Sequence, residues 1–169
     1  MSPLVNLSLE YSNKEKEMIT CPDCTPPQQH VLHQLQVRAD VRDKTALAVI
    51  MGNIEQESNF RSKVCEGGKI MPYDQCLRGG YGLIQWTTQA RYDGLGIFCK
   101  RYECDPSSVE GQTRYMINEL EFRNDLYAFQ IEHQQLKYYM NAAHYWLGWG
   151  VHGKRTHYSY SFLHKLQGS

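Results

Sequence analysis

The chain has 169 residues, and its 18 basic side chains balance its 18 acidic ones, so the formal net charge is zero at neutral pH. This balance, with no difference in sign between the two halves, argues against a nucleic-acid-binding protein. The hydrophobic share of 41% is that of an ordinary globular protein. No apolar stretch is long enough for membrane insertion, so we expect one domain with an apolar core.

The first residues differ in character from the remainder. Prolines punctuate residues 1–27, no helical period persists there, and Pro26-Pro27 predict the end of any element before them. We therefore expect an extension or docking arm over 1–27, with a frayed terminus as the alternative, and a single domain over 28–169. Residues 1–13 lack the features of a signal peptide, so we expect another carrier to bring the chain to any cell wall.

Helical patterns dominate the first part of the expected domain. Apolar residues recur at helical spacing after Gln28 and again over residues 46–59. Asp43 or Thr45 can cap the second of these helices.

A short region of different character follows. Residues 61–82 are rich in turn formers, and residues 83–87 are β-prone, which predicts a small hairpin. Helices resume after Thr88, and Ser107 with Glu110 fits a capping box. Two more helices are expected, over residues 136–147 and 158–166. The fold class is therefore α+β, mainly helical, with a small β-hairpin.

Six cysteines fall into three near pairs: Cys21 and Cys24, Cys65 and Cys76, Cys99 and Cys104. An even count permits disulfides, but the missing secretion signal favours reduced thiols. A zinc site is a third possibility, since His30 and His33 follow the first pair. The gap between these pairs is too short for the common zinc finger. We expect no metal and no cofactor.

One glutamate of the 46–59 helix stands out. Since each residue advances about 100° around a helix axis, Glu57 shares a face with Ile50 and Ile54, whereas Glu55 lies opposite. Apolar surroundings keep a carboxylic acid protonated, and cleavage of a glycosidic bond needs such an acid. Glu57 is therefore a candidate general acid and Glu55 an ordinary solvated residue. The competing interpretation is that Glu57 pairs with an arginine or faces water.

The surrounding motifs support the catalytic interpretation. Gly-Asn-Ile-Glu-Gln-Glu-Ser-Asn-Phe at 52–60 is followed by Gly-Tyr-Gly-Leu-Ile-Gln-Trp-Thr at 80–87. The pair resembles lytic transglycosylases and goose-type lysozymes, in which a helix ends in Glu-Ser and a Gly-x-Gly-Leu-x-Gln segment crosses the cleft. The chain resembles more specifically the phage tail lysozyme family. The motifs that carry this resemblance are Gly-Asn at the start of 52–60, Gln-Trp-Thr at the end of 80–87, Gly-Gln at 111–112 and Glu-Leu at 119–120. The resemblance extends over residues 46–120.

This resemblance implies a lysozyme-like fold with a cleft between the Glu57 helix and the hairpin. It implies that Glu57 is catalytic, that Ser58 supports the helix end, and that Tyr81, Gly82 and Gln85 bind substrate. Gly82 would also let backbone approach a sugar closely. The Gln85 amide offers a donor and an acceptor, which suit N-acetyl and hydroxyl groups.

Two neighbouring side chains have competing interpretations. Trp86 can stack on a sugar, although packing of the hairpin is favoured. Arg91 can bind a substrate carboxylate or form a structural ion pair. Glu119 is expected to stabilise its own helix or bind an arginine.

A second catalytic carboxylate is harder to assign. A two-carboxylate mechanism needs a partner roughly 5 to 9.5 Å from the acid. Glu66, Asp74 and Asp93 are candidates, and Asp74 is the first choice. Related families often use one glutamate, with the substrate's N-acetyl group or a held water replacing the second.

The implied function is a muramidase that cuts the β-1,4 bond between N-acetylmuramic acid and N-acetylglucosamine. As a phage tail or baseplate component in the virion, it would bind the peptidoglycan glycan strand and other tail proteins. The alternatives are a free endolysin, a cell-wall peptidase that uses Cys65, Cys76 or Cys99 with a histidine, and a catalytically silent virion assembly protein. Docking would then use residues 1–27 or 145–160.

Overall fold

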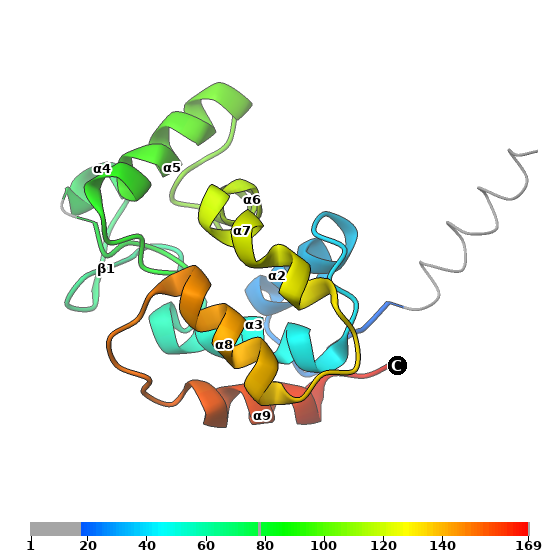
Figure 1. Ribbon diagram of the computed structural model, residues 1–169. Helices are drawn as coiled ribbons and strands as arrows, with labels where there is room; N and C mark the ends of the chain where they lie inside the picture. The colour runs from blue at the N-terminus through cyan, green and yellow to red at the C-terminus, as the bar shows by residue number, and fades with distance from the viewer. Residues whose placement is uncertain (1–17, 78, 169) are drawn as a thin grey trace, which may run out of the picture.

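The computed structural model describes residues 18–77 and 79–168 and is mainly helical, with one two-stranded antiparallel hairpin, which confirms the predicted fold class (Figure 1). The elements are α2 (Pro26–Val37), α3 (Lys44–Ser58), β1 (Val64–Cys65), β2 (Lys69–Ile70), α4 (Tyr73–Cys76), α5 (Gln89–Tyr102), α6 (Val109–Asn118), α7 (Leu120–Gln130), α8 (Leu136–Leu147) and α9 (Arg155–Lys165). In Figure 1, α4, α5 and β1 lie together at one end, and α3, α8 and α9 at the other. Within the described ranges, no helix has the length and apolarity needed to cross a bilayer.

Helix α3 is the centre of the molecule. Of the two predicted capping residues, Asp43 is the N-cap and accepts from the Ala46 N–H at 3.0 Å, and Asn59 ends the helix in the left-handed conformation. Every residue from Ala46 to Ile54 is buried, so this stretch of α3 is covered on all sides and has no solvated face. Helices α8 and α9 both pack on it.

The contact between α3 and α9 depends on a glycine. A Cβ atom at Gly52 would lie 2.6 Å from the Ser159 backbone nitrogen and 2.8 Å from its Cα atom. Neither of these atoms can move without moving α9, so only glycine allows the two helices this close an approach.

The part of the expected extension that the structure describes is packed on the domain. The backbone of Thr20 exchanges two hydrogen bonds with Gln167, at 3.0 and 2.8 Å. The buried Gln36 amide of α2 bonds both backbone groups of Ile19, at 2.8 and 2.9 Å. Residues 1–17 lie outside the described ranges.

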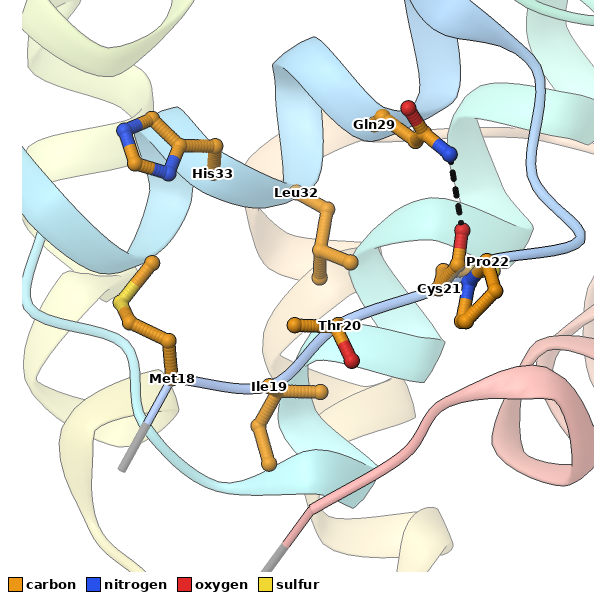
Figure 2. A pocket seen from close by; sticks show the side chains of 8 residues that line it. All are labelled: Met18, Ile19, Thr20, Cys21, Pro22, Gln29, Leu32 and His33. Atoms are coloured by element: carbon orange, nitrogen blue, oxygen red, sulfur yellow. Dashed lines mark hydrogen bonds between the residues drawn. The ribbon is translucent and has the colours of Figure 1, made fainter. Parts of the chain in front are cut away.

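Helix α2 begins at the proline pair, two residues before the helical pattern expected after Gln28. Thr25 and Gln28 form a capping box, and Pro26 and Pro27 occupy the first turn of α2, where no N–H is needed. Figure 2 shows the apolar pocket of about 540 Å³ between this helix and residues 18–22, with the Gln29 amide donating to the Cys21 carbonyl at 3.1 Å.

The prediction of a strand over residues 83–87 is wrong. The hairpin is β1 and β2, with Val64 opposite Ile70. Residues 82–85 form a turn that a bridge between Tyr81 and Trp86 closes. Gly82 and Gln85 have φ values of 78° and 52°, which an extended strand does not accommodate.

The predicted capping box before α6 does not form, because the N-cap lies one residue later and the residue at N3 is Gly111, which has no side chain to reach back. Ser108 is the N-cap and accepts from the Gly111 N–H at 2.9 Å, while the Ser107 hydroxyl accepts from the Tyr73 N–H at 2.8 Å. The following helix is also interrupted, since α6 ends and α7 begins at Glu119, whose backbone is extended.

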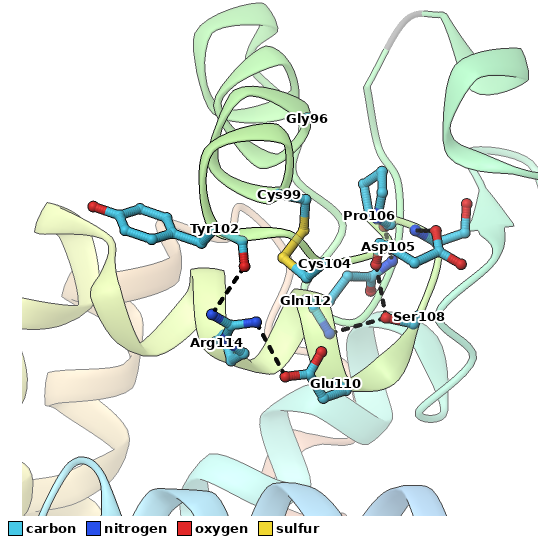
Figure 3. The surroundings of a disulfide bond; sticks show 12 residues. Gly96, Cys99, Tyr102, Cys104, Asp105, Pro106, Ser108, Glu110, Gln112 and Arg114 are labelled. Atoms are coloured by element: carbon cyan, nitrogen blue, oxygen red, sulfur yellow. Dashed lines mark hydrogen bonds and ion pairs between the residues drawn. A yellow bond between two sulfur atoms is a disulfide. The ribbon is translucent and has the colours of Figure 1, made fainter.

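All six cysteines form disulfides, so the expectation of reduced thiols is wrong. The bonds are Cys21–Cys24, Cys65–Cys76 and Cys99–Cys104. Figure 3 shows the third, which joins the last turn of α5 to the segment leading into α6. No cysteine has a thiol free to attack a substrate or to bind zinc, which removes both the cysteine peptidase and the Cys21–Cys24 zinc site.

Candidate functional site

A pocket of about 580 Å³ lies at the C-terminal end of α3. Its wall includes three of the predicted site residues, Glu57, Gln85 and Arg91, which come from α3, the 82–85 turn and α5. The opposite wall is the segment from the end of α8 to the start of α9. The end of the predicted catalytic helix therefore does border a hollow on the surface.

Glu57 is held by an ion pair. Its side chain is 18% exposed, and its Oε1 atom accepts from the Nη2 atom of Arg155 at 2.7 Å. The sequence-based picture of an acid surrounded only by apolar groups is therefore wrong. The competing interpretation, pairing with an arginine, holds, and Glu57 still faces the pocket.

Arg155 is the residue that sequence reasoning missed. It is buried at the start of α9, where its Nη1 atom donates to Asn53 Oδ1 at 3.0 Å. Its guanidinium lies 4.2 Å from the centre of the Trp149 ring, a cation–π distance. The three contacts fix the guanidinium against Glu57. The only feature of the sequence that could have indicated this role is the position of the arginine, shortly after Gly-Trp-Gly at 148–150.

Glu55 is not the ordinary solvated residue that was predicted. Burial raises the pKa of its carboxyl group, and the nearby charges of Lys165 and His157 oppose this rise. The error follows from treating α3 as a surface helix, whereas α9 packs on it and brings Lys165 and His157 near Glu55.

Gln85 and Ser58 connect the turn to the helix. The Gln85 amide nitrogen donates to the carbonyls of Val64 and Gly82, at 3.1 and 2.9 Å. The amide is therefore held in place at the pocket wall with a polar oxygen to offer. The buried Ser58 hydroxyl donates to the Leu83 carbonyl at 2.7 Å, which ties the end of α3 to the turn.

Three predicted substrate contacts have no free surface. Tyr81 and Trp86 are completely buried, and the Tyr81 hydroxyl donates to the Met71 carbonyl at 3.0 Å. A Cβ at Gly82 would collide with the Gln112 side chain, so the close approach there is made by protein. We assign these residues to support of the turn.

Arg91 takes part in a structural network. Its Nε and Nη2 atoms both donate to the buried Glu119 carboxylate at 2.9 Å. The Trp86 indole donates to the same carboxylate at 2.6 Å. Of the alternatives for Arg91, the ion pair is the one present, and Glu119 binds an arginine as expected.

The candidates for a second carboxylate lie outside the pocket wall. Asp74 is exposed on α4, and Glu66 and Asp93 are also exposed. Among the described residues that line the pocket, Glu57 is the one carboxylate. The site therefore offers one acid held by an arginine, a fixed amide, and the hydroxyl groups of Thr87 and Thr88.

A central helix that ends in a glutamate facing a pocket, beside a small hairpin, is the arrangement of lysozyme-like proteins. The phage tail lysozyme family model matches residues 38–155, and the chain belongs to this family. Comparisons with curated proteins and with solved structures gave no significant match. Membership points to lysozyme-like action on peptidoglycan.

Proposed function

We propose that the protein is a muramidase that cleaves the β-1,4 bond between N-acetylmuramic acid and N-acetylglucosamine. The observation that carries this proposal is the position of Glu57, which is largely buried and borders the pocket beside the fixed Gln85 amide. The amide and hydroxyl groups of the pocket wall suit a sugar chain as substrate, because its hydroxyl and N-acetyl groups donate and accept hydrogen bonds.

In the proposed mechanism the reaction begins from protonated Glu57, with Arg155 still donating to Oε1, and Glu57 gives the proton on Oε2 to the leaving oxygen as the glycosidic bond breaks. The carboxylate that results is stabilised by Arg155, which is already within hydrogen-bonding distance. The same carboxylate then activates a water molecule for attack. Gln85 positions the sugar through its amide.

We propose that Glu57 is the one protein carboxyl group in this mechanism. Asp74 was the first candidate for a second, but it lies on α4 and does not line the pocket. The substrate's N-acetyl group or a held water would take the second role.

The biological setting that we propose is a phage tail or baseplate, in which the enzyme opens the host wall during infection. Family membership supports this setting. A free endolysin is the alternative. Detection of the protein in purified particles would favour a tail component, and its absence from them would favour the endolysin.

The test is a turbidity assay on purified peptidoglycan with wild type, Glu57→Gln and Glu55→Gln. We expect Glu57→Gln to abolish lysis and Glu55→Gln, two residues away on α3, to retain it. Mass spectrometry would distinguish reducing sugars from anhydro sugars. Lysis by Glu57→Gln, or products with freed amines, would contradict the proposal, and an inactive wild type would favour the silent assembly protein.

A further inference from the structure

The segment between α8 and α9 separates the Glu57 pocket from a second pocket. The second pocket has a volume of about 510 Å³ and lies along one side of α8 and the start of α9. Trp149 lines both pockets. The two hollows are therefore neighbours on one surface, with an aromatic side chain between them.

Trp149 is held from both sides. The Arg155 guanidinium, which binds Glu57, lies 4.2 Å from the Trp149 ring centre. The His144 ring, which lines the second pocket, lies 4.6 Å from it, and His144 Nε2 is 3.2 Å from the Trp149 carbonyl oxygen. A ligand in the second pocket would thus contact the side chain that packs on Arg155, the residue that positions Glu57.

The two pockets differ in charge. The second is lined by Lys137 and by two histidines, His144 and His152, and no aspartate or glutamate is among its described lining residues. Asn141 and Thr156 add an amide and a hydroxyl, the latter 2.8 Å from His152 Nε2. The Glu57 pocket also contains two arginines, but Arg155 is paired with Glu57 and Arg91 with Glu119. Lys137 takes part in none of the salt bridges of the described residues, so an anionic ligand is favoured in the second pocket.

We propose that the second pocket binds the acidic stem peptide of peptidoglycan, beside the sugar whose bond is cut. This inference rests on the proposed function. A peptide attached to the glycan strand carries free carboxylates for Lys137 and backbone amides for Asn141 and Thr156. The enzyme would then recognise peptide-bearing strands better than bare glycan.

The test compares two soluble strands of equal glycan length, one with its stem peptides and one from which they have been removed. Binding is measured by calorimetry to the full chain carrying Glu57→Gln, with and without Lys137→Glu. We expect Lys137→Glu to weaken binding of the peptide-bearing strand roughly fivefold, since an exposed ion pair is lost. Binding of the bare strand should stay unchanged.

Lys100→Glu on α5, an exposed lysine outside both pockets, is the matched control and should affect neither strand. An equal loss on both strands would overturn the inference and indicate a further sugar site. Equal affinity of the parent protein for both strands would also overturn it. If the wild type binds peptide-bearing strands more tightly yet cleaves neither strand, the muramidase proposal fails and the peptide site stands.

Discussion

Arg155 and Glu57 lie 98 residues apart in the chain and are joined by a hydrogen bond of 2.7 Å between the Nη2 and Oε1 atoms. The bond connects the first turn of α9 to the last turn of α3. The candidate acid is therefore positioned by a charge that the C-terminal part of the domain supplies. Its geometry depends on the packing of α9 against α3.

Replacement of Arg155 by methionine should impair both stability and activity. The change leaves Asn53 and Glu57 without their donor, and removal of one partner from a buried ion pair costs about 3 kcal/mol. We expect kcat to fall more than KM rises, because Glu57 loses its position. Urea unfolding and a turbidity assay measure the two effects. Arg155→Lys is the control and should recover part of both, and an unchanged kcat in Arg155→Met would refute the positioning role.

Loss of the charge at Glu119 should destabilise the turn over residues 82–85, next to Trp86. Glu119 accepts from both Trp86 and Arg91, so Glu119→Gln leaves the Arg91 guanidinium without its counter-charge. We expect a loss of about 3 kcal/mol in the free energy of unfolding. Chemical denaturation followed by Trp fluorescence measures it. The exposed Glu121→Gln, in the first turn of α7, should cost little, and equal stability of the two variants would show that the buried network contributes nothing.

The raised pKa of Glu55 predicts a pH-dependent effect on stability. The folded protein holds this proton more tightly than the unfolded chain does, so ionisation of Glu55 lowers stability as the pH rises through the raised pKa. Glu55→Gln removes this cost. The Tm of the variant should exceed that of the wild type at neutral pH and match it below about pH 4, the range of an ordinary glutamate. A difference in Tm that is the same at both pH values would rule out the titration.

Gly52→Ala should separate the two helices that hold the site. The added methyl group meets the backbone of Ser159, which cannot rotate away. We expect a loss of about 2 to 3 kcal/mol, typical of overpacking. Gly150→Ala is the matched control, since a Cβ there meets no atom within 4 Å. A comparison of their denaturation midpoints is sufficient, and equal midpoints would mean that the helix contact tolerates the methyl group.

Local signals predicted several features of the helices. The Asp43 cap, the length of α3 and the glycine after α8 follow from short-range sequence rules, and the structure has all three. The environment of Glu57 could not be predicted in this way. Periodicity assigns faces to a helix, but not how many neighbours cover it, and the covering of α3 by α8 and α9 is a tertiary property. The role of Arg155 could not be predicted for the same reason, because it depends on the packing of α9 against α3.

The cysteine bonds have a consequence for the whole architecture. Each joins residues that are 3, 11 or 5 positions apart, so each staples a local loop and none fastens one helix layer to another. The global arrangement rests instead on the apolar surroundings of α3. Reduced and oxidised chains should therefore share one topology. The protein could then fold in a reducing compartment and form its disulfides later, in an oxidising one.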